Sequence, residues 1–276
     1  MKKKFFRKRG NWVHKGDFGY VLVVGGSRIY TGSVIFNALG ALKVGVDLVY
    51  IVAQQRVADI AAGFLPDIIA RPLDKDLELK HTEKIIKLSK KFDSLIIGSG
   101  LARNPKTYQA VRILLKNIAI PKAIDAEAIR ALAEKEKILN KLDLSKAILT
   151  PNSKEFEILT KEKLSTDLKE RKEKVQKWAQ KLKTVILLKG HIDVISDGKE
   201  VYLNKTGSSF MTKGGFGDLL AGICGGLLAL GVDNFEAAKL AAYINGKAGK
   251  LAAKKRKQSV LASDSFDYIN EVIKNL

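Results

Sequence analysis

Short hydrophobic runs alternate with longer amphipathic segments along most of this chain. Nearly all of the runs end in a glycine-rich or polar turn: YVLVVGG (20–26), DLVYIVA (47–53), SLIIGSG (94–100), KAID (122–125), KAILTPN (146–152) and TVILLKG (184–190). Continuous hydrophobic runs are typical of strands buried on both faces of a parallel sheet. Helical patterns separate most of them; in SVIFNALGALKVG, Ile35, Leu39 and Leu42 share one helical face. The alternation predicts an α/β fold with a mostly parallel central sheet.

The pattern changes in the carboxy-terminal part of the chain. The segment DVISDGKEVYLN (193–204) alternates around an Asp-Gly pair, which predicts a β-hairpin. Helical patterns follow to the end, in GDLLAGICGGLLALG (217–231), FEAAKLAAYINGKAGKLAAKK (235–255) and SDSFDYINEVIKNL (263–276). No long Pro/Gly/Ser linker, repeat or low-complexity tract interrupts the sequence. We therefore interpret residues 1–276 as one three-layer α/β/α domain.

The composition limits the class of protein. With 276 residues and 46% hydrophobic content, the chain is long enough to bury a large core. Its single cysteine, Cys224, lies in a hydrophobic run, and a lone buried thiol is typical of a reducing compartment. The basic start MKKKFFRKRG lacks the hydrophobic run of a secretory signal, and no other segment reaches the roughly 18 hydrophobic residues of a membrane span. We expect a soluble, cytoplasmic protein without a membrane partner.

The formal net charge of +20 suggests a polyanionic partner. Most lysines, however, alternate with acidic residues in helical patterns. In KEKLSTDLKERKEKVQKWAQKLK, charges of both signs separate hydrophobic residues at helical spacing: Leu164, Leu168, Val175, Trp178 and Leu182. This pattern is typical of a solvated helix face. Only KKRK (254–257) and the first ten residues are unmixed basic blocks, and neither has aromatic residues at a stacking rhythm, so we expect no specific nucleic-acid partner.

Ligands of parallel α/β sheets bind beyond the carboxyl ends of the strands, so the residues after each run are candidates for chemistry. The first run leads into GGSRIYTGS (25–33), where Gly26 and Gly32 lie six apart and no lysine follows. This segment fits neither the Walker A loop nor the G-x-G-x-x-G fingerprint. A second glycine pair follows a later run, in GSGLARN (98–104). Each turn alone is as consistent with a structural role as with ligand binding.

Asn152 and Glu155 follow another run, in PNSKE (151–155). At the start of a helix their side chains point the same way, and an amide with a carboxylate is suited to hold Mg²⁺ through water. In the structural alternative, Asn152 or Ser153 caps the helix and Glu155 completes a capping box. From these residues alone, the capping interpretation is favoured.

The run at 184–188 ends at Lys189, which Gly190 and His191 follow. A lysine there is usually a solvated turn residue, although in a site its charge would offset that of a phosphate. His191, His14 and His81 are the three histidines of the chain, and no Cys/His spacing typical of zinc occurs. The sequence therefore predicts no multi-histidine metal cluster, and His191 is most simply a turn residue.

The segment KGGFGDLLAG (213–222) has the densest glycine pattern. Gly214, Gly215 and Gly217 let backbone N–H groups converge, and a helix that starts near Gly217 adds free N–H groups and its positive dipole end. Such a turn binds phosphate without a cationic side chain. A carboxylate beside an anion site is unfavourable, but Asp218 has a role if the site transfers a phosphoryl group, as the base for the accepting hydroxyl. Alternatively, Asp218 is an ordinary residue of a helix start.

Together these segments resemble a known family. GGFGD with LLAG, preceded by NSKE, is similar to the anion-hole and metal motifs of the ribokinase-like superfamily. More narrowly, six segments occur in the order of the NAD(P)H-hydrate dehydratase family: HKGDFGYVLVVGGSRIYTGS, IIGSGLARN, AIDAEAI, LTPNSKEF, LLKG and GSSFMTKGGFGDLLAG. The resemblance extends from about His14 past Gly231, and six motifs in one order are much more specific than one.

The resemblance implies a ribokinase-like fold and a repair reaction. The family phosphorylates the ring hydroxyl of hydrated NADH or NADPH with ADP or ATP, and elimination of phosphate then restores the reduced nicotinamide. Asp218 would be the base, with an anion hole formed by Gly214, Gly215, Phe216 and Gly217. The other implied roles are nucleotide binding by Lys189, Gly190, His191, Ile192, Asp193 and Gly217, hydrate binding by Ser33, Gly100, Asn152 and Asp218, and Mg²⁺ binding, through water, by Glu155 and Asn152.

Three of these positions depart from the usual family pattern: Phe216 replaces Thr or Ser, Asn152 replaces His and Ser33 replaces Ala. The resemblance also implies a homo-oligomer. The alternative function is a ribokinase-like kinase acting on a hydroxymethyl or hydroxyethyl group of a vitamin precursor, which would release a stable phosphorylated product. It would share GGFGD and NSKE but gives no reason for HKGDFGYVLVVGGS. A non-catalytic nucleotide-binding or nucleic-acid-binding protein would keep the glycines without needing Asp218.

Overall fold

The computed structural model describes residues 6, 8–134, 139 and 141–276. In this part of the chain a nine-stranded sheet has the order β3-β2-β1-β4-β5-β6-β7-β8-β9. Neighbouring strands from β3 to β7 are parallel, whereas β8 and β9 are added antiparallel. The strands are β1 (Tyr20–Val24), β2 (Leu48–Gln54), β3 (Ile68–Leu73), β4 (Ser94–Ile97), β5 (Lys122–Ile124), β6 (Ala147–Leu149), β7 (Val185–Leu188), β8 (Asp193–Ser196) and β9 (Val201–Asn204).

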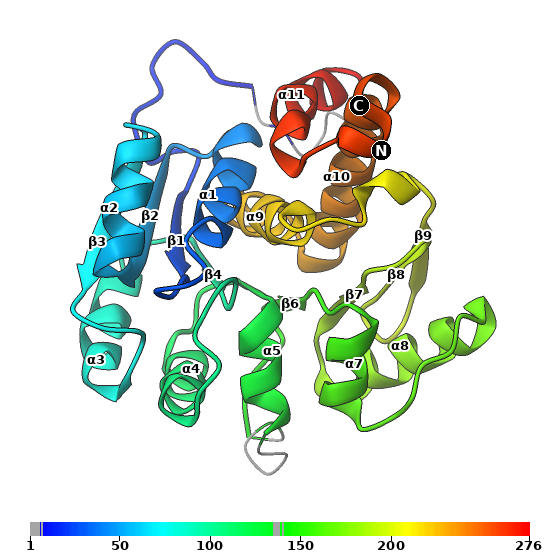
Figure 1. The fold of residues 1–276 in the computed structure, drawn as a ribbon, viewed down its shortest axis with the longest axis horizontal. Coiled ribbons are helices and arrows are strands. Elements are labelled where there is room, and N and C mark those ends of the chain that lie inside the picture. Colours follow the sequence, from blue (N-terminus) through cyan, green and yellow to red (C-terminus); the bar gives the residue numbers. More distant parts are fainter. Residues whose placement is uncertain (1–5, 7, 135–138, 140) are drawn as a thin grey trace.

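Helices cover both faces of the sheet (Figure 1). They are α1 (Ser33–Lys43), α2 (Gln55–Phe64), α3 (Leu79–Ser89), α4 (Pro105–Asn117), α5 (Ala126–Ala133), α7 (Ser153–Thr160), α8 (Leu168–Leu182), α9 (Phe216–Ala229), α10 (Asn234–Arg256) and α11 (Phe266–Lys274), with the 3-10 turns η2 (Ser209–Met211), η3 (Lys257–Ser259) and η4 (Ala262–Ser265).

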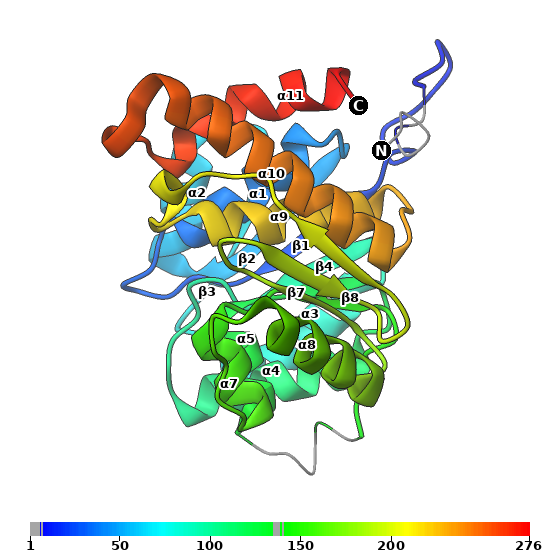
Figure 2. The same ribbon diagram turned by 90° about the vertical axis from the view of Figure 1, so that its right-hand side faces the viewer.

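The sheet lies between two helical layers, which Figure 2 shows from the side. In the view of Figure 1, α1, α9, α10 and α11 lie above the sheet, and α3, α4, α5 and α7 lie below it. Side chains of β1 divide between two cores: Val21 and Val23 pack on the α9 side, and Leu22 and Val24 on the α4 side. Burial on both faces explains the continuous hydrophobic run of this strand.

The predicted elements are confirmed, with one strand added. Each hydrophobic run contains a strand, and the Asp-Gly segment forms the β8–β9 hairpin, with Gly198 at a φ of +91°. The additional strand, β3, forms the edge of the described sheet. Its exposed Arg71 and Pro72 interrupt the hydrophobic run, and proline is tolerated on an edge strand because its missing N–H is not needed there.

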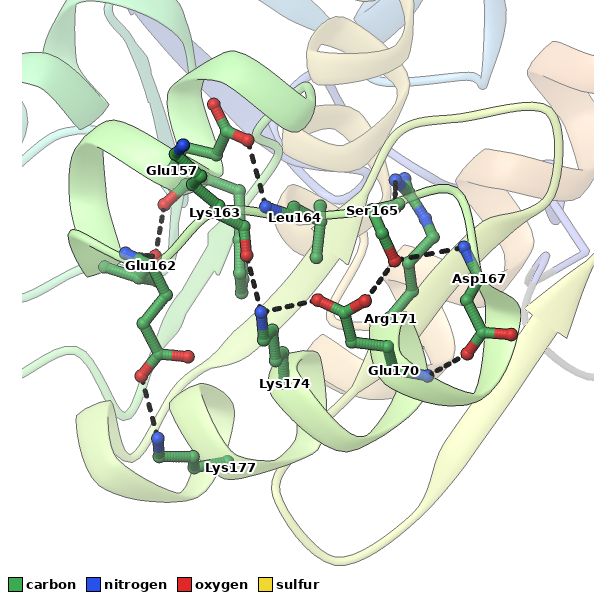
Figure 3. A network of polar contacts seen from close by, with 12 residues as sticks. Glu157, Glu162, Lys163, Leu164, Ser165, Asp167, Glu170, Arg171, Lys174 and Lys177 are labelled. Carbon is green, nitrogen blue, oxygen red and sulfur yellow. Dashed lines mark hydrogen bonds and ion pairs between the residues drawn. The ribbon is translucent and has the colours of Figure 1, made fainter.

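The lysine-rich amphipathic segment forms a shorter helix than its spacing predicts. Helix α8 begins at Leu168, where Asp167 caps it by accepting a hydrogen bond from the N–H of Glu170 at 2.7 Å. Leu164 lies before the helix, in the loop after α7 (Figure 3), and its N–H donates to Oε1 of Glu157 at 2.9 Å. The aspartate cap satisfies a free N–H group at the start of the helix. The helix therefore begins at Leu168, although the hydrophobic spacing extends back to Leu164.

The glycines within α9 allow close packing against two neighbours. A Cβ at Gly222 would lie 2.8 Å from Cα of Asn37 in α1, and a Cβ at Gly225 would overlap Ile96 of β4. The side-chain amide of Asn37 also donates to the carbonyl oxygen of Asp218 at 2.7 Å. The glycines after Asp218 therefore serve helix packing, and this packing fixes the start of α9.

No helix in the described residues is long and apolar enough to cross a membrane. Of the two basic blocks, residues 254–257 lie at the end of α10 and the start of η3, whereas most of the N-terminal block falls outside the described residues. Cys224 is a buried free thiol of α9, as its hydrophobic surroundings in the sequence predict.

Candidate functional site

Several predicted site residues meet at the carboxyl ends of the central strands. The chain leads outward from β1 to β3 and then returns to β4, so the sheet has its topological switch point between β1 and β4, where ligands of such sheets bind. A Cβ at Gly100, after β4, would lie 3.1 Å from Oγ of Ser33 at the start of α1. A Cβ at Gly217, at the start of α9, would lie 3.3 Å from Nζ of Lys189, after β7.

The glycine-rich turn leaves the start of α9 open to an anion. Gly215 precedes the helix with a φ of +95°, a conformation that glycine adopts without strain. No side chain in the described part of the chain caps this helix start, and a Cβ at Gly214 would meet no atom within 4 Å. Free N–H groups and the positive dipole end therefore face an open turn, as a phosphate site requires.

Asp218 lies in the first turn of α9, beside the glycine-rich turn. Burial raises the pKa of its carboxyl group to about 6, and the carboxylate of Asp125 acts in the same direction. Lys189 and the hydroxyls of Ser99 and Ser33 oppose this increase in pKa. A carboxylate with a pKa near neutrality can accept a proton at physiological pH and release it again.

A buried ion pair lies next to Asp218. Nζ of Lys189 donates to Oδ1 of Asp125 at 2.8 Å, and the two side chains are 20% and 3% exposed. Oγ1 of Thr150 donates to the same oxygen at 2.8 Å, and Oγ of Ser99 donates to Oδ2 at 3.3 Å. Asp125 is thus held by donors that follow three different strands: β4, β6 and β7.

Lys189 supplies the positive charge of this group. Burial alone would lower the pKa of its ammonium group, but the carboxylates of Asp125, Glu155 and Asp218 outweigh burial and raise the pKa. The ammonium group therefore stays protonated at neutral pH, close to the backbone of Gly217. Its charge offsets the surrounding carboxylates, which would otherwise repel a phosphate.

Asn152 and Glu155 form the capping box at the start of α7, so the capping interpretation is confirmed. Oδ1 of Asn152 accepts from the N–H of Glu155, and Oε2 of Glu155 accepts from the N–H of Asn152, both at 2.9 Å. Burial raises the pKa of Glu155, while Lys189 lowers it. Of the two carboxylate oxygens of Glu155, only Oε2 forms a hydrogen bond with a described residue, so the cap leaves Oε1 free for another role.

The loop from Lys189 to Asp193 joins β7 to β8. Oδ1 of Asp193 accepts from the N–H of Gly190 at 3.0 Å, and Oδ2 accepts from Nδ2 of Asn204 at 2.9 Å. Burial raises the pKa of Asp193. Both carboxylate oxygens hold the turn in shape, whereas His191 is exposed. The backbone of this loop, rather than the carboxylate of Asp193, is available to a ligand.

Arg171 of α8 supports this loop. Its Nη2 donates to the carbonyl oxygen of Lys189 at 3.3 Å, and its Nη1 donates to Oγ of Ser153 at 3.2 Å. Figure 3 shows the polar network around α8, in which the carboxylate of Glu170 accepts a hydrogen bond from Ser165. The network connects α8 to the loop after α7. Through its hydrogen bonds to Lys189 and Ser153, Arg171 connects the end of β7 to the start of α7.

The side chain of Phe216 does not belong to the predicted anion hole. It is 4% exposed and packs in a hydrophobic cluster with Ala252, Ala253, Val260 and Ala262. Only the backbone N–H of Phe216 is therefore available to an anion. The aromatic side chain at this position adds core contacts, where a hydroxyl residue could have contacted phosphate.

Phe216→Thr should destabilise the protein by about 3–5 kcal/mol, the usual cost of truncating a buried phenylalanine, while folded molecules keep the backbone of the turn. Urea unfolding followed by circular dichroism measures this change. Phe64→Thr is the matched control, because Phe64 is 56% exposed at the end of α2. Equal stability of the two variants would show that the cluster does not depend on Phe216.

Three residues of the site are not predicted from the sequence: Asp125, Ser99 and Arg171. Asp125 lies in the segment AIDAEAI, and Ser99 lies in GSGLARN. Each lies within two residues of the carboxyl end of a strand, which is the signal that could have identified them. Arg171 has no comparable signal, because it is one of many basic residues on a charged helix, and only the structure shows that it is 8% exposed.

This chain is similar to known proteins over most of its length. The family model described as NAD(P)H-hydrate dehydratase matches residues 21–271. The bifunctional NAD(P)H-hydrate repair enzyme Nnr of Pyrobaculum aerophilum is 41% identical over 264 residues, which are 94% of this chain and 51% of that protein. The ADP-dependent (S)-NAD(P)H-hydrate dehydratase of Cenarchaeum symbiosum is 36% identical over 275 residues, which are 99% of this chain and 94% of that protein.

A solved structure extends the similarity to three dimensions. The ADP/ATP-dependent NAD(P)H-hydrate dehydratase from Bacillus subtilis, co-crystallised with ATP/Mg²⁺, matches with a TM-score of 0.82 at 29% identity, over 97% of this chain and 93% of that chain. The three layers are those of the ribokinase-like fold. The chain spans about half the length of the bifunctional relatives it matches. Because the family model covers nearly the whole chain, this protein belongs to the NAD(P)H-hydrate dehydratase family.

Proposed function

We propose that this protein converts hydrated NADH and NADPH back to the reduced dinucleotides, with ADP or ATP as the phosphoryl donor. The observation that carries the proposal is the carboxyl group of Asp218, whose pKa is raised by burial to about 6 beside an uncapped helix start. The name of the Cenarchaeum relative, an ADP-dependent (S)-NAD(P)H-hydrate dehydratase, supports this choice of substrate.

In the first step, Asp218 accepts the proton of the ring hydroxyl while the hydroxyl oxygen attacks the terminal phosphorus of the donor. The bond from that phosphorus to the bridging oxygen breaks, which releases AMP from ADP or ADP from ATP. The backbone N–H groups from Gly214 to Gly217, with the dipole of α9, stabilise the negative charge on the group in transfer. Lys189, held by Asp125 at 2.8 Å, adds a fixed positive charge near Gly217.

In the second step, the phosphate leaves the ring with the electrons of the C–O bond. A neighbouring ring carbon loses a proton to solvent, and the double bond of the reduced nicotinamide returns. The oxygen of the added water departs in the phosphate, so atoms balance without an oxidant or reductant. The same turn stabilises the departing phosphate, and this chemistry depends on positioning and charge rather than on a covalent enzyme intermediate.

Two groups of residues are proposed to hold the ligands. The backbone of Gly100 lies close to Ser33, and the backbone of Gly217 lies close to Lys189, which supports binding of both ligands at this end of the sheet. The hydrate would contact Ser33, Gly100, Asn152 and Asp218, and the nucleotide would contact Lys189, Gly190, His191, Ile192 and Gly217 along a loop that Asp193 keeps in shape.

The residues present fit a magnesium ion that is held indirectly. Mg²⁺ in nucleotide sites usually keeps several waters and binds through one or two carboxylates and the substrate phosphates. Glu155 keeps one oxygen outside the capping box, and the described residues contain no cluster of three or more His, Cys, Asp or Glu that could hold a metal ion. We therefore propose that Glu155 and Asn152 hold Mg²⁺ through water, where it would neutralise phosphate charge.

We also propose that residues 1–276 form one domain that acts in the cytoplasm as a homo-oligomer. The continuous sheet from β1 to β9 supports a single domain, and the buried free thiol of Cys224 supports a reducing compartment. Light scattering after size-exclusion chromatography measures the oligomeric state.

The proposed reaction is tested by mixing the protein with hydrated NADH, Mg²⁺ and either ADP or ATP. Recovery of the NADH absorbance with one donor identifies both the reaction and the donor. Reactions without nucleotide, or with a chelator, are the matched controls and should show no recovery. A folded protein that binds nucleotide but restores no NADH with either donor would contradict the proposal.

Activity should rise with pH through about 6. Burial raises the pKa of Asp218 to about 6, so below this pH its carboxyl group is protonated and cannot accept the hydroxyl proton. We expect kcat/KM for hydrated NADH to fall about tenfold for each pH unit below that pKa, and to level off above pH 7. A rate profile between pH 5 and pH 8 measures this, and a flat profile would argue against Asp218 as the base.

A further inference from the structure

The loop after β4 faces the loop after β1 at the edge of the proposed hydrate site. A Cβ at Gly100 would lie 3.1 Å from both Oγ of Ser33 and Cβ of Tyr30. Arg103 follows three residues later and lies near enough to Tyr30 for that side chain to influence the pKa of its guanidinium group. Arg103 is therefore close to the hydrate site but outside the glycine-rich turn.

Arg103 is exposed and yet held in place. Its side chain is 67% exposed, while Nε and Nη2 donate to Oε1 of Glu127 at 3.1 and 2.6 Å. The hydroxyl of Tyr108 donates to the other oxygen of Glu127 at 2.5 Å, which fixes this carboxylate in turn. The Nη1 donors of Arg103 have no partner among the described residues. An arginine that is already ordered loses less conformational entropy when it binds a ligand.

The charge around Arg103 favours an anion. Nε of Arg130 lies 3.4 Å from the same oxygen of Glu127, so two guanidinium groups share one carboxylate. The hydrogen bonds to Glu127 raise the pKa of Arg103, which therefore stays charged. The planar guanidinium matches two oxygens of a phosphate, and arginine is the usual residue for such contacts.

A groove of about 650 Å³ opens next to this arginine. It lies between the loops that follow β1, β2 and β3 and the start of α4, and Asn104 is part of its wall. The wall carries three basic side chains that could contact phosphate and three carboxylates that could accept from ribose hydroxyls: Arg28, Lys75, Lys106, Asp74, Asp76 and Glu78. Ligand sites typically measure about 300–1,000 Å³, so the groove has room for a nucleoside.

We infer that Arg103 binds the pyrophosphate of the hydrated dinucleotide and directs the adenosine half into this groove. The inference rests on the proposed function. It assigns a specificity-determining role to a residue outside the catalytic turn. The enzyme would then distinguish a dinucleotide from a smaller hydrated nicotinamide through Arg103.

Two substrates separate this role from a structural one. Hydrated NADH carries the pyrophosphate, whereas the hydrate of reduced nicotinamide riboside carries no phosphate. Arg103→Gln should raise KM for hydrated NADH about ten- to a hundredfold, as expected for a lost hydrogen bond between charged groups, with little change in kcat. KM for the riboside hydrate and KM for ADP should stay the same. Arg103→Lys, which keeps the charge, should lose less.

Arg256→Gln is the matched control, because Arg256 is 63% exposed and forms an ion pair with Asp264 at 3.8 Å, at the end of α10. Thermal unfolding verifies that every variant is folded. If the riboside hydrate is too poor a substrate to measure, the test rests on hydrated NADH alone, for which Arg103→Gln should raise KM and leave kcat nearly unchanged.

An unchanged KM for hydrated NADH, an equal loss on both hydrates, or a higher KM for ADP would each overturn the inference about Arg103 and leave the proposed function intact. If the wild-type protein turns over neither hydrate, that result would contradict the proposed function and therefore also the inference about Arg103.

Discussion

Asp218→Asn should reduce turnover of hydrated NADH by about 10²- to 10⁴-fold, the range for a lost general base. The amide keeps the size of the side chain but cannot accept the hydroxyl proton. The carbonyl oxygen of residue 218 still accepts the hydrogen bond from Asn37, so the start of α9 is preserved and nucleotide binding should be unchanged. Single-turnover rates and calorimetric titration with ADP measure these two effects separately.

The same substitution should raise stability at neutral pH. The ordinary pKa of an aspartate is 3.8, whereas burial raises that of Asp218 to about 6 in the folded state. Between these pH values the folded state holds the proton more tightly than the unfolded state. The contribution of Asp218 to stability is therefore present below about pH 4 and is lost as the pH rises through about 6. Asparagine does not ionise, so the unfolding temperature should increase at pH 7 and change little at pH 4.

Asp267→Asn is the matched control, since the side chain of Asp267 is 96% exposed in α11. It should change neither the rate nor the pH dependence of stability. A fully active Asp218→Asn protein would show that Asp218 is an ordinary residue of the first helical turn and not the base. A variant that loses nucleotide binding together with activity would also contradict its assignment as the base.

Asp125→Ala should lower the free energy of unfolding by about 3–5 kcal/mol, as the removal of one partner from a buried ion pair does. The substitution leaves the ammonium group of Lys189 without its partner at 2.8 Å and removes an acceptor from Thr150. Turnover should fall as well, because Lys189 is no longer fixed near Gly217. Urea unfolding and single-turnover rates measure the two effects.

The double variant Asp125→Ala/Lys189→Met separates the cost of an unpaired charge from the cost of lost contacts. With both charges removed, part of the stability lost in Asp125→Ala should return. Activity should not return, because the positive charge beside the turn is gone. Simple addition of the two single losses would show that the pair is not coupled.

Much of the fold can be predicted because its patterns extend over only a few residues. Buried strands appear as continuous hydrophobic runs, and an Asp-Gly pair marks the hairpin. The edge strand β3 escapes this rule, since its exposed Arg71 and Pro72 break the run. The start of α8 differs from the spacing of Leu164 because the side chain of Asp167 caps the helix three residues later.

The site is less predictable, for a physical reason. The sequence locates each strand end, but the strand order decides which ends meet. Asp125 and Lys189 pair across 64 positions because β5 and β7 both adjoin β6. The sequence also does not show which way a side chain points. Phe216 follows the glycines of the turn, yet its side chain packs into the core.

The mass balance of a single turnover tests the proposed dehydration most directly. The protein is mixed with hydrated NADH, Mg²⁺ and limiting ADP, or ATP, and the products are separated by chromatography. NADH and phosphate should form in equal amounts, together with the same amount of AMP from ADP or of ADP from ATP. A stable phosphorylated compound that does not proceed to NADH would show that the protein is a kinase, and would contradict the proposed reaction.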